Sequence, residues 1–366
     1  MNVLDFPSTQ SSHTLEETLQ DLVRQVHFNS KFRIQHPDYQ PFELPMEVVD
    51  RFAKVPEEIR NRYRSLQLRS FIYGIYYNGS MQASLSLDAP QNGLQLDLEN
   101  NTVLGIDPEF FERLHESNQG EGYFDPGWLI LQEEDSDKLL VQKGELKLHI
   151  ERDRHLQSEA KSAAVGETVA IKMPKNLMQN GFYMAVGDAG TQSLKAVDAL
   201  PETVRIYFNC TPEGAIKVMK SLTREFNAIF LPFTFKVLYN PGDYGRYDSG
   251  VLYFEKQYRK SVWSVLQVIY EENKAHFQPQ VPLFTKCLAP GLGLAEEPDA
   301  KFSMNESFGM NRCQIVANGL LDAWQRQENS PESRMEAIVQ QFSLLGIDLE
   351  RAYLNANSED IYEPLK

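Results

Sequence analysis

The stretch that decides the fold runs from residue 201 to residue 254 and reads PETVRIYFNCTPEGAIKVMKSLTREFNAIFLPFTFKVLYNPGDYGRYDSGVLYF. Strand side chains point alternately to opposite faces, so apolar residues at every second position predict a half-buried strand. Two segments show this alternation, and their apolar faces carry Val204, Ile206 and Phe208, then Leu231, Phe233, Phe235 and Val237. We therefore expect two strands joined by a helix over residues 213–228, then a Gly-rich turn and a third strand.

The opposite faces of the same two strands carry cations. Arg205 and Lys236 alternate with the apolar residues, and the turn after the second strand supplies Arg246. Because one face of an antiparallel sheet is commonly solvated, the simpler interpretation is ordinary surface charge. The alternative is a small basic floor that binds an anionic group, and alternation does not decide between the two.

Composition and charge limit the class of protein. The 366 residues are 42% hydrophobic and 24% charged, which is ordinary for a soluble globular chain with a real core. A net charge of -15 argues against nucleic acid and anionic membrane as partners, because both need a basic surface. The same net charge is still compatible with a local basic pocket.

Cysteine usage and the N-terminus favour the cytoplasm. Cys210, Cys287 and Cys313 are widely separated and show no zinc-ligand spacing, so we expect no metal site. So few cysteines fit a reducing compartment. The N-terminal residues lack a signal-peptide pattern, and no apolar run approaches the ~20 residues that span a bilayer. We expect a soluble cytoplasmic protein.

The N-terminal third is predicted to be helical. Thr14 and Glu17 form a capping-box pattern ahead of an apolar helical repeat. A longer helical region runs from about Met46 to Tyr77 with a break near Pro56, and a short helix follows over residues 107–114. A Gly- and Pro-rich stretch places a soft boundary near residue 120.

Beyond that boundary, strands come first and helices return later. Alternation predicts strands over residues 127–131, 139–141, 145–151, 168–173 and 181–188, and helical spacing predicts helices over 257–276, 311–327, 331–344 and 348–354. The connection over 279–310 is interpreted as an ordered, functional loop. The expected class is α+β: a mixed or mainly antiparallel sheet with packed helices and an N-terminal helical subdomain. The division expected is residues 1–120 and 121–366.

No familiar catalytic motif is present in the sequence. There is no dinucleotide fingerprint, Walker loop, nucleophile elbow or zinc-protease motif, and the pair Gly291 and Gly293 is a weak phosphate signal. His149 and His155 are the histidines nearest in sequence, and each is interpreted first as an ordinary histidine. The remaining candidates are cations in apolar or turn-rich contexts, namely Lys172, Lys175, Arg205, Lys236, Arg246, Lys286 and Arg312. If several converged, they would suit an anionic substrate group.

Several runs resemble the type III secretion effector HopA family. These are GFYMAVGD, RIYFN, FKVLYNPGDYGRYDSGVLYF, VPLFTKCLAPGLGLAEEP and ESFGMNRCQIVANGL. The resemblance covers roughly residues 120–330 and is specific in combination. Within that family the chain looks like a stand-alone bacterial member, found notably in cyanobacteria. The helical N-terminal third lies outside the resemblance.

The resemblance implies two functions. HopA-like proteins of modified-peptide (lanthipeptide-like) pathways resemble lyases that work with a kinase-like phosphotransferase. The kinase phosphorylates Ser or Thr of a precursor peptide, and the lyase eliminates phosphate to leave dehydroalanine or dehydrobutyrine, with no metal or organic cofactor. Other HopA-like proteins are virulence factors that engage host immune regulators, which implies the alternative of a non-catalytic module that binds a partner protein or peptide.

Elimination needs a base for the Cα proton, cations for the phosphate, a proton donor and a group that stabilises the enolate-like oxygen. With the resemblance in place, we assign Lys236 as the base, because a Lys among cations can have its pKa lowered. The phosphate clamps are then Arg205, Arg246 and Arg312, with Lys286 beside them. Tyr183 or Tyr207 would stabilise the enolate, and His155 would be the general acid.

Overall fold

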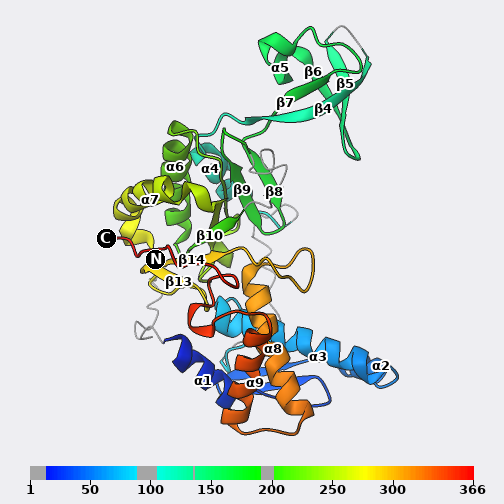
Figure 1. The fold of residues 1–366 in the computed structure, drawn as a ribbon, viewed down its shortest axis with the longest axis vertical. Helices are drawn as coiled ribbons and strands as arrows, with labels where there is room; N and C mark the ends of the chain where they lie inside the picture. The colour runs from blue at the N-terminus through cyan, green and yellow to red at the C-terminus, as the bar shows by residue number, and fades with distance from the viewer. Residues whose placement is uncertain (1–13, 89–104, 135–136, 191–201) are drawn as a thin grey trace.

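A seven-stranded antiparallel sheet lies at the centre of the computed structural model, which describes residues 14–88, 105–134, 137–190 and 202–366 (Figure 1). The strand order is β13-β14-β10-β12-β11-β9-β8. In chain order the strands are β8 (Asn176–Gln179), β9 (Phe182–Val186), β10 (Thr203–Phe208), β11 (Thr234–Leu238), β12 (Gly250–Glu255), β13 (Lys286–Ala289) and β14 (Leu292–Glu296). The stretch singled out in the sequence supplies β10, β11 and β12 at the middle of this sheet.

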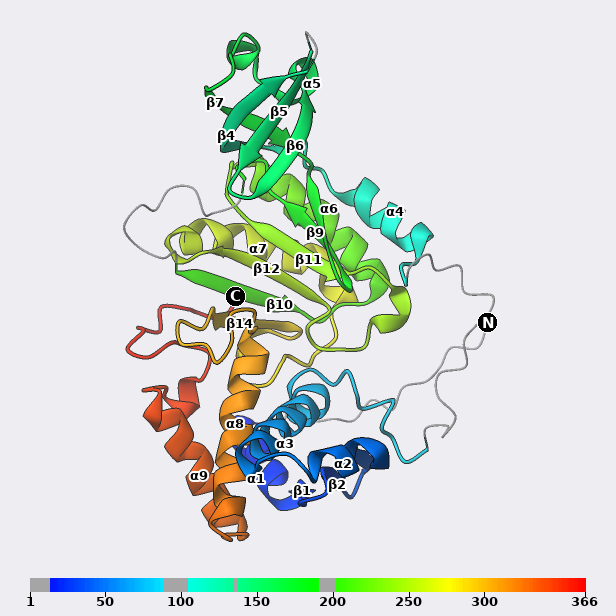
Figure 2. The same cartoon turned by 90° about the vertical axis from the view of Figure 1, so that its right-hand side faces the viewer.

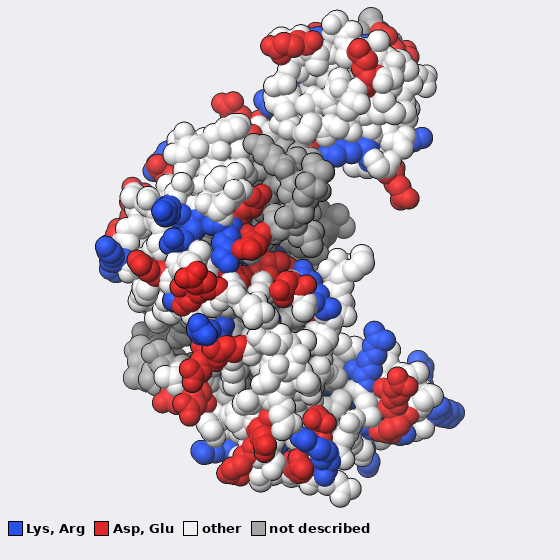
Figure 3. Space-filling model, in the orientation of Figure 1, with Lys and Arg blue, Asp and Glu red and all other residues white. Residues whose placement is uncertain are grey.

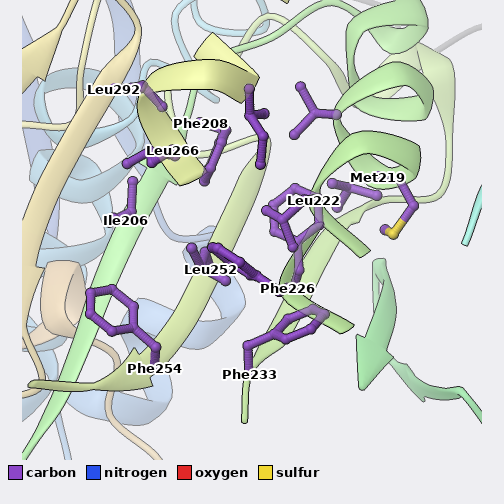
Figure 4. Packing of buried hydrophobic residues seen from close by; sticks show 14 of the residues in the cluster. Ile206, Phe208, Met219, Leu222, Phe226, Phe233, Leu252, Phe254, Leu266 and Leu292 are labelled. Carbon is purple, nitrogen blue, oxygen red and sulfur yellow. The ribbon is translucent and has the colours of Figure 1, made fainter. Parts of the chain in front are cut away.

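One face of the sheet packs against helices. They are α4 (Pro108–Ser117), α6 (Pro212–Ala228) and α7 (Arg259–Asn273), with the short η4 (Pro241–Asp243), η5 (Lys256–Tyr258) and η6 (Lys274–His276) in the connections. Ile206 and Phe208 of β10 meet Leu222 and Phe226 of α6 in this core (Figure 4). The predicted alternation is confirmed in β11, where Phe235 and Val237 are buried. In β10 the predicted apolar face is buried, but Arg205 and Tyr207 on the opposite face are buried as well, so the expectation of a solvated face is wrong for this strand.

The other face is covered over β14, β10 and β12 by a helical region built from both ends of the chain (Figure 2). Its helices are α1 (Leu15–Gln25), α2 (Met46–Phe52), α3 (Glu57–Ile72), the π-helical turn η1 (Tyr73–Tyr77), α8 (Phe308–Gln325), α9 (Pro331–Leu344) and η7 (Leu349–Arg351). A small sheet of β1 (His27–Phe28), β2 (Arg33–His36) and β3 (Tyr39–Glu43) belongs to the same region. Since α3 packs on α8 and α1 on α9, segments far apart in sequence share this core.

A four-stranded antiparallel sheet projects from the body in both ribbon views (Figures 1 and 2). It contains β4 (Tyr123–Glu133), β5 (Lys138–Lys143), β6 (Leu146–Glu151), α5 (Arg152–His155), η2 (Ser158–Ala160) and β7 (Thr168–Met173). Its own core is centred on Trp128, Ile130, Leu139 and Val141. We call residues 123–173 the outer module.

The predicted fold class, α+β with an antiparallel sheet, is confirmed. The capping box is also confirmed, since Thr14 accepts from the Glu17 amide and Glu17 accepts from the Thr14 amide. The loop predicted over 279–310 is wrong in part, because it contains the hairpin β13–β14. That hairpin was hidden because buried β14 reads as a continuous apolar run rather than an alternation. The division at residue 120 stays a prediction.

Candidate functional site

The register of the central strands places three cations on the sheet face opposite the α6 core. Arg205 of β10 lies directly opposite Tyr253 of β12, and Tyr253 lies opposite Thr234 of β11. Lys236, two residues beyond Thr234, shares its face because side chains alternate along a strand. Arg246 comes from the turn between β11 and β12.

Two aromatic rings link these cations into one row. The Arg205 guanidinium carbon lies 5.0 Å from the centre of the Tyr253 ring, and the Lys236 Nζ lies 5.6 Å from the same centre. Lys236 Nζ also lies 4.4 Å from the centre of the Phe182 ring, and the Arg246 guanidinium carbon lies 6.0 Å from that centre. We call Arg205, Tyr253, Lys236, Phe182 and Arg246 the cation–aromatic row. Each contact is within the range of cation–π attraction.

Lys236 differs from the two arginines in its partners. Its Nζ donates to Gln179 Oε1 at 3.2 Å, and within the part of the chain that the structure describes it has no ion pair. Gln179 reaches it from β8, across the intervening strand β9. The amine is therefore held by one neutral oxygen and two ring faces.

Arg205 is buried and bound to a carboxylate. Its Nε and Nη2 contact Glu297, which also pairs with Lys301. Burial lowers the pKa of Arg205, but Tyr253, Tyr207 and Glu297 outweigh burial and raise it overall. The guanidinium is thus a fixed positive charge at one end of the row.

Arg246 occupies the other end of the row. Its Nε donates to Asp248 Oδ1 at 2.6 Å and its Nη2 to Asp248 Oδ2 at 3.0 Å, a two-pronged ion pair. Asp248 is buried and also accepts from Asn78 Nδ2 and from the Tyr73 hydroxyl. Burial lowers the pKa of Arg246, but Asp248, Tyr73 and Tyr77 together outweigh burial and raise it overall.

The two predicted tyrosines lie on opposite faces. Tyr207 shares the face of Lys236, separated from it by Val251 in the register. Its hydroxyl is buried beside Tyr77 and Arg205, and burial raises its pKa to about 12 although Arg205 opposes the shift. Tyr183 lies in the α6 core, where its hydroxyl meets Asn118 Nδ2 at 3.0 Å and His115 Nδ1 at 3.2 Å.

Three other predicted residues lie away from the row. Lys286 pairs in register with Leu294, so it is on the α6 face, and its Nζ meets Asp360 Oδ2 at 2.6 Å. Arg312 is buried in α8 and donates to the carbonyls of residues 352 and 354 at 2.7 and 2.9 Å. His155 belongs to α5 of the outer module, where its Nδ1 is 3.0 Å from the Glu151 amide nitrogen. The structure thus gathers Arg205, Lys236, Arg246 and Tyr207 and separates the others.

Only part of the cation–aromatic row could be predicted from the sequence. Phe182 and Tyr253 sit in strands that alternate, so a face assignment for β9 and β12 could have found them. Asp248 follows Arg246 by two residues, so its proximity to Arg246 could also have been predicted. Asn78 gave no signal, because 170 residues separate it from Asp248.

The cation–aromatic row contains three cations, although the chain as a whole is acidic. Three cations of the row meet two carboxylates, Glu297 and Asp248. On the side of the molecule in Figure 3, acidic and basic side chains are interspersed over the described surface. The forks of Arg205 and Arg246 are occupied by these two carboxylates, so Lys236 is the member of the row without a described carboxylate partner.

Three further observations concern the described residues. Among the described residues, no group of three or more His, Cys, Asp and Glu side chains could hold a metal ion. A groove lined by residues 229–231, Tyr258 and Val265 lies between the end of α6 and α7 and has no Lys or Arg in its lining. No described helix is both long and apolar enough to cross a bilayer.

Comparison with known proteins identifies the family. Residues 173–354 match the sequence model of the HopA1 effector protein family. The effector protein from Pseudomonas syringae pv. tomato strain DC3000 is similar at 17% identity and a TM-score of 0.43, with 81% of this chain and 96% of that chain covered. The effector protein from Pseudomonas syringae pv. syringae strain 61 is similar at 14% identity and a TM-score of 0.40, with 68% and 81% covered. No curated protein sequence matches the chain. The segment of residues 173–354, which includes every member of the cation–aromatic row, belongs to the HopA1 effector protein family.

Proposed function

We propose that this protein is a phosphopeptide lyase that eliminates phosphate from phosphoserine or phosphothreonine in a precursor peptide. The observation that carries the proposal is the cation–aromatic row, in which a Lys amine without a described carboxylate partner lies between two guanidinium groups. Its substrate would come from a kinase-like phosphotransferase, and both steps would take place in the cytoplasm. The pathway would be one of lanthipeptide-like peptide modification.

The reaction is a redox-neutral β-elimination. Neutral Lys236 accepts the Cα proton, and the electrons of the Cα–H bond form the Cα=Cβ double bond. The Cβ–O bond breaks, and phosphate leaves with its bridging oxygen. Phosphoserine gives dehydroalanine and phosphothreonine gives dehydrobutyrine. The guanidinium groups of Arg205 and Arg246 stabilise the charge on the departing phosphate.

The arginines keep donors for a ligand despite their ion pairs. A guanidinium has five N–H donors, and Arg246 uses Nε and Nη2 on Asp248. Its Nη1 makes no hydrogen bond to a described residue. An incoming phosphoryl group can therefore bind without breaking the pair with Asp248.

Tyr207 is the better candidate for the enolate-like oxygen. Its side chain is on the face of Lys236, and its hydroxyl lies beside Tyr77 and Arg205. With its pKa raised to about 12 by burial, it keeps its proton at neutral pH and can donate it in a hydrogen bond. Tyr183 faces the α6 core instead, and His155 belongs to the outer module, so neither enters this mechanism.

The proposal is tested by incubating the protein with phosphothreonine and phosphoserine peptides, or with the precursor peptide and its kinase. Loss of the elements of phosphoric acid in the mass spectrum is the expected result. Lys236→Ala should abolish the loss, while Lys220→Ala, which changes an exposed Lys on α6, should leave it unchanged. A folded wild-type protein that binds the phosphopeptide but leaves it intact would favour the non-catalytic module instead.

A further inference from the structure

We infer that Tyr73 and Asn78 in the N-terminal region position the Arg246 guanidinium through Asp248, and so complete the phosphate site. The inference rests on the proposed function and deepens it. It assigns a role in phosphate binding to residues far outside the segment 173–354 that matches the family.

The contacts converge on a single buried carboxylate. Asp248 accepts hydrogen bonds from Arg246 Nε and Nη2. It also accepts from Asn78 Nδ2, at 3.2 and 3.3 Å to its two oxygens, and from the Tyr73 hydroxyl at 3.3 Å. Asn78 is fully buried, and the Asp248 side chain is 7% exposed. Donors on three residues therefore fix the orientation of the carboxylate, and the carboxylate fixes the guanidinium.

The π-helical turn η1 makes this possible. The Asn78 amide bonds to the Tyr73 carbonyl at 3.1 Å, a link between residues five apart rather than four. The wider turn allows the side chains of Tyr73 and Asn78 to reach the same carboxylate. Single π turns of this kind occur often at functional sites.

The backbone holds the turn against the Arg246 loop. The Tyr247 amide donates to the Asn78 carbonyl at 2.9 Å. Gly79 has φ +72°, and a Cβ there would come within 3.0 Å of the Tyr247 ring, so only Gly allows this approach. The η1 turn and the Arg246 loop therefore pack together, which explains why Asn78 and Asp248 meet although they are distant in sequence.

Tyr73→Phe tests the inference, because it removes one hydroxyl and keeps the ring. The matched control is Tyr76→Phe in the same turn, whose hydroxyl contacts Asp21 Oδ2 and His36 Nε2, each at 2.9 Å. With a phosphothreonine peptide, Tyr73→Phe should raise KM roughly three- to tenfold with little change in kcat, and Tyr76→Phe should leave KM unchanged. Thermal unfolding of both variants checks that each is folded.

A second readout does not depend on turnover. Inorganic phosphate is titrated into the wild-type protein while the Arg246 Nε–H resonance is followed by NMR. The resonance should shift in the wild type, and Tyr73→Phe should weaken the apparent affinity while Tyr76→Phe should not. If Arg246 does not respond to phosphate, or if the two variants behave alike, the inference is overturned. If phosphate binds as expected but no phosphopeptide is eliminated, the lyase proposal fails alone.

Discussion

At the scale of single residues, the difference between the three cations is the presence of a carboxylate. Arg205 and Arg246 are neutralised by Glu297 and Asp248, whereas Lys236 contacts ring faces and an amide oxygen. A guanidinium stays protonated in proteins, but an amine can lose its proton. The row therefore combines two guanidinium groups paired with carboxylates and one amine that has no described carboxylate partner.

The buried pair of Arg246 and Asp248 is expected to stabilise the fold. Asp248→Asn removes the charge that neutralises a largely buried guanidinium, so the free energy of unfolding in urea should fall by about 2 kcal/mol. The control is Glu43→Gln, which removes an exposed ion pair with Arg33 and should change stability by less than about 0.5 kcal/mol. Equal effects of the two changes would contradict the assigned role of Asp248.

The lowered pKa of Glu296 predicts how the free energy of unfolding depends on pH. Burial raises its pKa, but hydrogen bonds from Asn355, Lys256, Ser358 and Tyr362 outweigh burial and lower it. A carboxyl with a lowered pKa in the folded state stabilises that state above its unfolded value of 4.5. This stabilisation is lost as pH falls through the lower folded value.

The corresponding measurement is urea unfolding from neutral pH to below pH 4.5, with wild type and Glu296→Gln compared. The wild type should lose more stability on acidification than the variant, because only the wild type must protonate this carboxyl on unfolding. Parallel curves for the two proteins would rule out Glu296 as a source of the pH dependence.

At the scale of elements, η1 and the start of α8 approach each other at Gly309. A Cβ at this position would lie 2.3 Å from the Tyr77 ring. Gly→Ala inside a helix gains up to ~1 kcal/mol in propensity, but overpacking costs about 1–3 kcal/mol. The steric cost should exceed the gain in helix propensity, so Gly309→Ala is expected to destabilise the protein and to displace η1.

The control is Gly242→Ala, where nothing lies within 4 Å of the added Cβ. Thermal unfolding should show a lower Tm for Gly309→Ala and a Tm close to wild type for Gly242→Ala. A stabilised Gly309→Ala variant would mean that Tyr77 moves freely, which contradicts the packing of η1 described above.

Elements also show how far the sequence could predict the site. Alternation in β10 and β11 correctly placed Arg205 and Lys236 on one face, because strand periodicity is a local property. The same reasoning failed for Lys286, since β13 was not recognised and its face could not be assigned. Arg312 was misleading for another reason: its partners are carbonyls 40 and 42 residues further along the chain, and no local pattern reports such contacts.

At the scale of the whole molecule, we expect the outer module to be separable from the rest. It has its own core, and its two ends are adjacent because Tyr123 pairs with Met173 in register. Replacing residues 124–172 by a short Gly-Ser turn should leave a folded body with an intact cation–aromatic row. Cooperative thermal unfolding of this variant checks the expectation, and an unfolded product would show that the body depends on the module.

The helical region and the central sheet, in contrast, are expected to act as one unit. Asp248 lies in the loop after β11, and its partners Tyr73 and Asn78 lie in or next to η1. Contacts over such sequence distances cannot be read from local patterns, so the N-terminal third gave no signal of its contact with Asp248. The structure supplies that signal through a single buried carboxylate.

The central claim, that Lys236 removes the Cα proton, is tested most directly with Lys236→Arg. Arginine carries a permanent positive charge and cannot act as a base at neutral pH. Binding of a phosphothreonine peptide and its elimination are measured on the same preparation. The account predicts a Kd close to that of the wild type and no detectable loss of phosphate. Elimination by Lys236→Arg at the wild-type rate would contradict it.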